Sequence, residues 1–273
     1  MLITIITINY NNREGLARTL ESVRMQTSKE FEYIVIDGGS DDGSRELIED
    51  NQDIIDSWVS ERDKGIYNAM NKGVERAHGE YSLFLNSGDV LHDPKVMQRV
   101  LDSNLSADIV FGRVQNCFPD GKTELYVPAE EMSLMWIIRT GIHHAGSFIR
   151  NSLMRKHPYD EKFRICSDRK FFVEALVIDN CTMQNLDFTV CDFEIGGISS
   201  SAKDVAKQEY WQIMDELFPP RVVSDYRKSD ERIQRMTGEL VRCRYRIISL
   251  ICGLDIFIIK IFKLILGNKI FRS

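Results

Sequence analysis

The alternation of short apolar runs with amphipathic segments over the first ~100 residues constrains the fold of this chain most. Four runs rich in β-branched and aromatic residues are predicted strands, at residues 2–8, 31–37, 54–60 and 81–86. Between the first two, Leu16, Leu20 and Val23 recur at helical spacing and predict an amphipathic helix. Strand and helix in alternation indicate an α/β domain with a mostly parallel central sheet flanked by helices.

Each predicted strand is followed by a polar turn, and the four turns read NYNN, DGGSDDGS, ERDKG and NSGD. The carboxyl ends of parallel strands meet at one edge of a sheet, where ligands bind. We therefore expect Asp37, Asp63 and Asp89 to gather there. Neighbouring carboxylates repel each other unless a cation lies among them, and one or two carboxylates with substrate phosphates are the ligands typical of Mg²⁺. Taken singly, each turn is more typical of structure, since Asp and Gly are common turn formers.

Charge is distributed unevenly along the chain. The formal net charge is −6, which argues against nucleic acid as the main partner. From residue 221 onward, however, there are 12 Lys and Arg against 5 Asp and Glu. We therefore predict a domain over residues 1–220 and a basic tail over residues 221–273 that meets something anionic.

Cysteine usage favours a cytosolic location. The six cysteines form no C-x-x-C pair, and no histidine stands at zinc-finger spacing from them, so we expect reduced thiols and no zinc site. The N-terminus, MLITIITINY, lacks a positive lead and a small-residue cleavage site. It is predicted to be a first strand rather than a signal peptide.

Several longer stretches resemble family 2 glycosyltransferases of the GT-A fold, in the branch that builds bacterial capsule, exopolysaccharide and O-antigen chains. These stretches are TINYNN, VIDGGSDDGS, SERDKGIYNAMNKGVERAHGEYSLFLNSGD, HHAGSFIRNSL, YDEKFRICSDRKFFVEAL and GGISS. They occur in this order over about residues 1–200. VIDGGSDDGS and DKGIYNAMNKG are specific when they occur together, whereas each short piece alone is a weak signal.

The resemblance implies the inverting transfer of a sugar from a nucleotide-diphosphate donor to a hydroxyl of a glycan or lipid-linked acceptor. It implies that Asp89 is the last residue of a motif for Mg²⁺ or Mn²⁺, and that Asp168 is the general base on the acceptor side. Asp37 and Asp63 would lie against the nucleoside part of the donor. The predicted donor-binding residues are Asn9, Tyr10, Asp37, Asp63, Lys72, Asn86 and His144.

The chain departs from the family pattern in three places. Gly38 stands where a second Asp is usual after Asp37, and Asn86 replaces the first carboxylate of the metal motif. Metal binding is then expected to depend more on the donor phosphates. Asp168 is preceded by Ser167 and followed by Arg169-Lys170, whose positive charges would attract an anionic acceptor or lower the pKa of Asp168.

Two candidate residues keep simpler interpretations. Asp168 precedes the apolar helix that contains Phe171 and Phe172, so it fits a plain N-cap as well as a catalytic base. The adjacent histidines, His143 and His144, fit a pair without a ligand role. We favour that interpretation for His143 and consider both open for His144.

The apolar part of the tail is too interrupted for a membrane-spanning helix. Arg242, Arg244 and Arg246 lead into it, and its interruptions are Asp255, Lys260 and Lys263. Basic residues beside an apolar helix are typical of a segment lying on an anionic membrane surface. We therefore expect a cytoplasmic protein that is peripheral on the membrane. The alternative is a tail helix that packs on the domain or on a second subunit.

Three other classes are less favoured. A nucleotidyltransferase needs a basic, glycine-rich phosphate loop after the first strand, and NYNNREG has a single Arg and a single Gly. A dinucleotide-dependent dehydrogenase needs a G-x-G-x-x-G sequence there, which is missing. A degenerate GT-A module that binds a nucleotide or glycan without catalysis remains the alternative, because of Asn86 and Lys170.

Overall fold

The structure is a computed structural model that describes residues 3–130, 132–134, 136–137, 142–196, 202–232 and 235. The chain divides into two compact units, residues 1–213 and 214–273. The boundary predicted after residue 220 falls within the second unit, and most of the predicted tail, including Arg242 to Phe271, lies outside the described residues.

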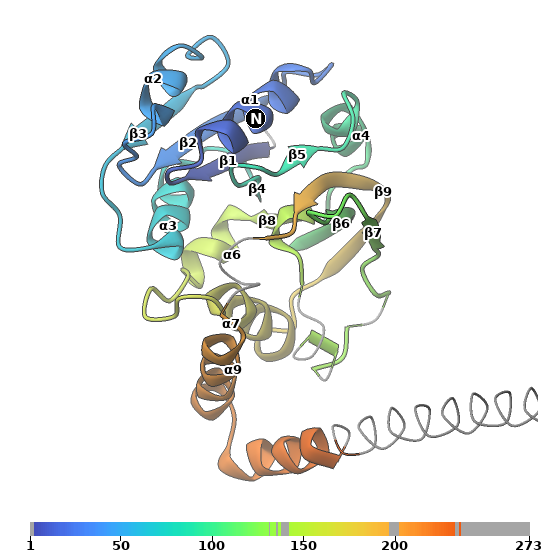
Figure 1. The fold of residues 1–273 in the computed structure, drawn as a ribbon. Coiled ribbons are helices and arrows are strands. Elements are labelled where there is room, and N and C mark those ends of the chain that lie inside the picture. Colours follow the sequence, from blue (N-terminus) through green and yellow to red (C-terminus); the bar gives the residue numbers. More distant parts are fainter. Residues whose placement is uncertain are drawn as a thin grey trace, which may run out of the picture. The chain divides into compact units, whose positions relative to one another are not determined.

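The predicted parallel strands form one half of the central sheet (Figure 1). They are β1 (Ile3–Asn9), β2 (Phe31–Asp37), β3 (Ser57–Ser60) and β4 (Tyr81–Phe84), in the spatial order β3-β2-β1-β4. The register pairs Asn9 with Asp37 and Asp37 with Ser60, so the carboxyl ends of three strands lie side by side. The α/β architecture predicted from the sequence is therefore confirmed.

The other half of the sheet is mixed rather than parallel. It contains β5 (Val90–Leu91), β6 (Ile109–Cys117), β7 (Thr123–Tyr126), β8 (Ser147–Arg150) and β9 (Met183–Glu194). β8 is antiparallel to both β4 and β6, whereas β9 is parallel to β6 and antiparallel to β5. β6 and β7 form a hairpin, because their short connection permits only an antiparallel pair.

Helices cover both faces of the parallel half, with α1 and α2 on one face and α3 on the other (Figure 1). The helices described in the first unit are α1 (Arg13–Arg24), α2 (Ser44–Glu49), α3 (Ile66–Arg76), α4 (Val96–Asp102), α6 (Asn151–Lys156), α7 (Ser167–Val173) and α9 (Lys203–Leu217), whose last residues belong to the second unit. A short 3₁₀ segment at His144–Gly146 precedes β8, and a π-helical turn at Glu174–Ile178 continues α7.

Local sequence signals explain the helix positions. Asn12 caps α1 by accepting a hydrogen bond from the Gly15 backbone N–H at 3.1 Å. On α3, Gly73 permits close packing on the sheet, because a methyl group there would lie 2.5 Å from Cγ2 of Ile6. Asp93, which precedes Pro94, is not the N-cap of α4. Its carboxylate accepts from the Lys95 N–H at 2.8 Å, and α4 begins only at Val96.

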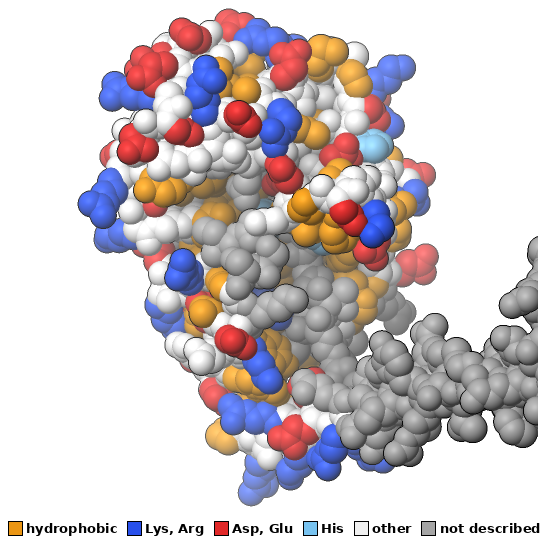
Figure 2. Space-filling model, viewed as in Figure 1, with side chains coloured by type: hydrophobic (Ala, Val, Ile, Leu, Met, Phe, Trp, Pro, Cys, Tyr) orange, Lys and Arg blue, Asp and Glu red, His pale blue; other side chains and the backbone are white. Residues whose placement is uncertain are grey.

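Charged side chains of both signs are interspersed over the described part of the face drawn in Figure 2. The four cysteines described, Cys117, Cys166, Cys181 and Cys191, are free thiols. Among the described residues, no helix has the length and apolar character needed to cross a membrane.

Candidate active site

Asp37 is the most deeply buried carboxylate at the carboxyl edge of the parallel strands, with no exposed surface. Its Oδ1 accepts from Asn9 Nδ2 at 2.7 Å and from Ser40 Oγ at 2.5 Å, and its Oδ2 accepts from Ser60 Oγ at 2.6 Å. Burial raises the pKa of Asp37, but the hydrogen bonds from Ser40, Ser60 and Asn9 outweigh it and hold the pKa below its usual value. Asp37 therefore stays ionised and orders the turn that follows β2.

Tyr10, Gly38 and Asp63 lie together beside Asp37. A methyl group on Gly38 would lie 2.6 Å from Oδ2 of Asp63 and 3.1 Å from Cδ2 of Tyr10. The Tyr10 side chain is 65% exposed, so its ring is available to a ligand. Asp63, from the loop after β3, thus lies against Gly38, the position where the family pattern has a second Asp, and a larger residue there would have to push the Asp63 carboxylate aside.

Lys72 does not reach this cluster as a free cation. Its Nζ lies 2.7 Å from Oε1 of Glu61, which pairs it with the turn that also carries Asp63. A donor phosphate would have to compete with Glu61 for this lysine.

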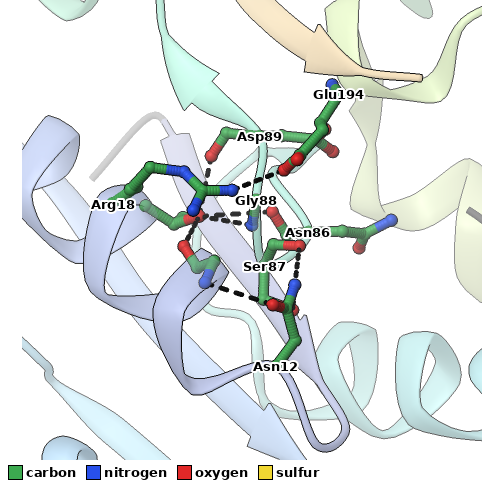
Figure 3. A network of polar contacts seen from close by, with 9 residues as sticks. Asn12, Arg18, Asn86, Ser87, Gly88, Asp89 and Glu194 are labelled. Carbon is green, nitrogen blue, oxygen red and sulfur yellow. Dashed lines mark hydrogen bonds and ion pairs between the residues drawn. The ribbon is translucent and has the colours of Figure 1, made fainter. Parts of the chain in front are cut away.

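The turn after β4 is held by α1 (Figure 3). Asn12 Nδ2 donates to the Ser87 carbonyl oxygen at 2.9 Å, and Thr19 Oγ1 donates to the Asp89 carbonyl oxygen at 2.7 Å. Gly88 has φ +109°, a conformation that a side chain would strain. The turn therefore presents Asp89 in a fixed orientation.

Asp89 is 4% exposed, and its pKa is raised to about 7, mainly because burial disfavours the carboxylate. The positive charge of His144 lowers that pKa and the negative charge of Glu194 raises it, and neither changes the net direction. The positive charge of His144 is thus too weak to offset burial and keep this carboxylate fully ionised.

Glu194, at the end of β9, is the second carboxylate of this cluster, and sequence reasoning missed it. Its backbone N–H donates to Oδ1 of Asp89 at 3.2 Å, and its Oε2 lies 2.5 Å from Nη2 of Arg18 (Figure 3). A methyl group on Gly88 would lie 2.7 Å from the same Oε2. The only sequence signal was the position of Glu194 just before GGISS, of which the structure describes Gly196 alone.

Asp168 lies at the start of α7 and faces the turn after β4 through His144. Its Oδ2 is 3.6 Å from Nδ1 of His144, and its Oδ1 is 3.0 Å from the Tyr67 hydroxyl. Burial raises the pKa of Asp168, but His144 outweighs it, with a smaller contribution from Arg169, and the pKa is lowered. Lys170 instead lies 2.7 Å from Oδ2 of Asp160. Tyr67, inside the DKGIYNAMNKG stretch, is another residue that sequence reasoning missed.

His144 lies between Asp168 and the turn that carries Asn86 and Asp89. Burial lowers its pKa, but the negative charges of Asp168 and Asp89 outweigh burial and raise it. Its Nε2 lies 3.1 Å from Nδ2 of Asn86, whose buried Oδ1 has no partner among the described residues. Turning the amide over would let that oxygen accept from an Nε2–H of the ring.

His143 points away from this cluster. Its ring packs against Tyr126 and Phe193, with centroid distances of 4.6 and 5.2 Å. Burial, followed by the charge of His144, lowers the pKa of His143 to about 4, so the ring is neutral.

The sequence profile described as Glycosyl transferase family 2 matches residues 4–177, which include both carboxylate turns and Asp168. The chain belongs to this family. A glycosyltransferase of Mycobacterium tuberculosis is 31% identical over 210 residues, which cover 72% of this chain and 77% of the relative. A PGL/p-HBAD biosynthesis glycosyltransferase of Mycobacterium bovis is 26% identical, covering 74% of this chain and 81% of the relative. The chain is therefore a glycosyltransferase, as the sequence predicted.

Two solved structures show the same GT-A fold at low sequence identity. S. aureus TarS 1–349, in complex with UDP-GlcNAc, superposes with a TM-score of 0.64 at 20% identity, over 78% of this chain and 64% of that protein. The mannosyltransferase PcManGT from Pyrobaculum calidifontis, in complex with GDP-Man and Mn²⁺, has a TM-score of 0.57 at 14% identity, over 78% and 63%. This chain thus spans a little less than two thirds of each.

Gly38→Ala tests the cluster of Tyr10, Gly38 and Asp63. The new methyl group would displace the end of the Asp63 side chain, which can move, so the change in stability should stay below about 1 kcal/mol. If this cluster binds a nucleotide, binding should weaken by roughly tenfold, or about 1.4 kcal/mol, because the methyl group would displace Asp63 and press on Tyr10. Calorimetric titration with nucleotide, beside melting without it, measures both. An unchanged dissociation constant would show that the cluster does not bind the nucleotide.

Proposed function

We propose that this family 2 glycosyltransferase moves a sugar from a nucleotide-diphosphate sugar to a hydroxyl of a glycan or lipid-linked acceptor, with inversion at the anomeric carbon, in the synthesis of a surface polysaccharide or glycolipid. The observation that carries the proposal is the placement of Asp168 opposite the turn that bears Asp89. His144 lies between them, 3.6 Å from Asp168 and 3.1 Å from Asn86. A base and a diphosphate-binding turn facing one another are what a single displacement requires.

In this reaction the acceptor hydroxyl oxygen forms a bond to the anomeric carbon while the bond from that carbon to the diphosphate oxygen breaks. The electron pair of the broken bond leaves on the diphosphate. The hydroxyl proton passes to Asp168, whose lowered pKa keeps it ionised and able to accept at neutral pH. One displacement at the opposite face inverts the configuration. His144, with its raised pKa, balances the charge of Asp168.

The side chains around Asp89 fit a divalent cation. Carboxylate oxygens are the ligands that Mg²⁺ and Mn²⁺ prefer, and Asp89 supplies them. Glu194, whose backbone N–H contacts Asp89, would add its own carboxylate only by leaving its ion pair with Arg18. Among the described residues, no three His, Cys, Asp or Glu side chains form a metal-binding group by themselves. The donor diphosphate would complete the coordination, and the cation would stabilise negative charge developing on the leaving group.

The donor site would extend from this turn across the strand ends. Tyr10 offers an exposed ring for stacking a base, and Asp63 offers carboxylate oxygens beside it. Asp37 and Asn9 would support that surface indirectly, because their contacts hold the turn that follows β2 in place. The relatives solved with UDP-GlcNAc and with GDP-Man and Mn²⁺ support a nucleotide sugar as the donor class.

The acceptor proposal rests on the tail and on the relatives. The basic residues from Arg242 to Arg246, followed by an apolar segment, would place the enzyme at the cytoplasmic face of an anionic membrane. Lipid-linked acceptors are found there, and a PGL/p-HBAD biosynthesis enzyme is among the relatives.

Thermal melting with UDP, GDP, dTDP and CDP, each with Mn²⁺ and with EDTA, tests the donor site. One nucleotide at a hundredfold excess over its dissociation constant should add about 2.7 kcal/mol with Mn²⁺ and much less with EDTA. No stabilisation by any of the four would contradict the proposal. NMR of the product of the matching nucleotide sugar then tests inversion, because a retained anomeric configuration would exclude a single displacement.

A further inference from the structure

The carboxylate of Glu209 lies beneath the loop that leads into Asp168. Glu209 belongs to the part of α9 that lies in the first unit, and it is 9% exposed. It accepts three consecutive backbone hydrogen bonds, from the N–H groups of Arg164 at 2.7 Å, Ile165 at 2.9 Å and Cys166 at 2.9 Å. Three successive N–H groups that converge on one carboxylate form a nest for an anion, here filled from within the chain.

These bonds replace a cap that the local sequence does not supply. Cys166 is the N-cap residue of α7 and makes no side-chain capping hydrogen bond, and Ser167 Oγ is buried with no partner among the described residues. Hydrogen bonds to an ionised acceptor are about twice as strong as neutral ones. The start of α7 is therefore fixed mainly by a residue more than 40 positions away in the sequence.

The same loop is fixed from its other side by Tyr67. The Tyr67 hydroxyl lies 2.6 Å from the Ile165 carbonyl oxygen and 3.0 Å from Oδ1 of Asp168. Glu209 thus binds the backbone N–H groups of residues 164–166. Tyr67 binds the Ile165 carbonyl oxygen of the same loop and the carboxylate of Asp168. A shift of this loop would move Asp168 directly, since Asp168 follows Cys166 by two residues.

We propose that Glu209 is a positioning residue that sets the place of the catalytic base Asp168 by anchoring residues 164–166. The inference rests on the proposed function, because it takes Asp168 as the base. Glu209 itself contacts the loop, and it acts on the reaction only through the position of Asp168.

Glu209→Gln is the most direct test, because it preserves shape and turns one acceptor into an N–H₂ group facing backbone N–H groups. A misplacement of about 1 Å can cost up to about a hundredfold in rate, so we expect kcat to fall between about ten- and a hundredfold. The KM for the donor and the nucleotide-induced rise in melting temperature should stay unchanged. Glu209→Asp, which keeps the charge on a shorter side chain, should recover part of the loss.

Glu32→Gln is the matched control. Glu32 is 6% exposed and accepts from Thr4 Oγ1 at 2.6 Å and from the His78 N–H at 2.8 Å. It lies near the amino end of β2, at the opposite edge of the sheet from the site. This substitution should lower the melting temperature by a comparable amount and leave kcat within about twofold, as expected away from the reacting groups.

The assay is release of the nucleoside diphosphate from the matching nucleotide sugar during slow transfer to water, so that the acceptor need not be known. Glu209→Gln should add no further loss in an Asp168→Asn background, because the two substitutions remove one function. Amide hydrogen exchange of residues 164–168 should become faster in the single variant.

Equal kcat losses in Glu209→Gln and Glu32→Gln, or additive losses with Asp168→Asn, would overturn the inference. Full activity of Asp168→Asn would instead overturn the proposed base, whatever Glu209→Gln does.

Discussion

Asp168→Asn is expected to reduce sugar transfer by about 10²–10⁴-fold, the contribution of a positioned general base. The amide cannot accept the acceptor proton, yet it can still accept hydrogen bonds from the Arg169 N–H and the Tyr67 hydroxyl. The fold and the donor site should therefore persist. Steady-state kinetics beside nucleotide-induced melting separates the two effects, because kcat should collapse while the melting shift remains.

Asp179→Asn provides the control for this variant. Asp179 ends the same helical segment at its other end, where it pairs with Lys156 and His157 at 2.6 Å. Its replacement should change stability and leave transfer unchanged. Transfer that survives in Asp168→Asn would show that Asp168 only supports the first turn of α7, whose N-cap is Cys166, and would direct the search for the base to His144. Loss of both transfer and nucleotide binding would show that Asp168 maintains the whole site.

Asp89→Asn is expected to stabilise the metal-free protein while abolishing metal-dependent donor binding. In the unfolded chain Asp89 has its ordinary pKa of 3.8, and in the folded chain the pKa is raised to about 7 because of burial. A raised pKa means that this group's stabilising contribution is complete below about pH 4 and is lost as the pH rises through about 7. A pKa that rises from 3.8 to about 7 on folding corresponds to at most about 4 kcal/mol of stability.

The asparagine carries no charge at any of these pH values, and its oxygen can still accept from the Glu194 N–H. With EDTA, the variant should therefore melt higher than the parent at pH 8, and the two should converge near pH 4. With Mn²⁺, the nucleotide that stabilises the parent should no longer stabilise the variant. Asp93→Asn is the control with the opposite sign, because hydrogen bonds from the Lys95 N–H and Arg99 outweigh the effect of burial and lower the pKa of Asp93. A variant that melts lower than the parent at pH 8 would contradict a charge-burial cost at Asp89.

Asp89→Asn separates the stability of the metal-free protein from metal-dependent nucleotide binding, two properties on which we expect the charge of Asp89 to have opposite effects. Thr19 and the turn at Gly88 hold Asp89 in a buried position. Without a ligand, burial of this carboxylate destabilises the folded chain. A cation bound there would supply the missing counter-charge. In the proposed site, the charge that favours the cation would therefore be the same charge that destabilises the protein without it.

The amino-acid sequence determined the parallel half of this protein and the edge where its turns meet. Uninterrupted β-branched runs specify strands covered on both faces, and helical spacing in α1 and α3 specifies the crossovers between them. From that topology alone, Asp37, Asp63 and Asp89 had to follow strands that end at one edge. The family resemblance added Asp168, which the local pattern could equally describe as a cap.

The tertiary structure alone decided which side chains meet across the mixed half of the sheet. Glu194 reaches Asp89 only because β9 pairs with β5, and Glu209 reaches the loop before Asp168 from another helix. These contacts join residues separated by up to about a hundred positions. Local periodicity records which face of an element is apolar, but strand order and helix docking follow from packing of the whole core, so the sequence pattern contains no signal for them.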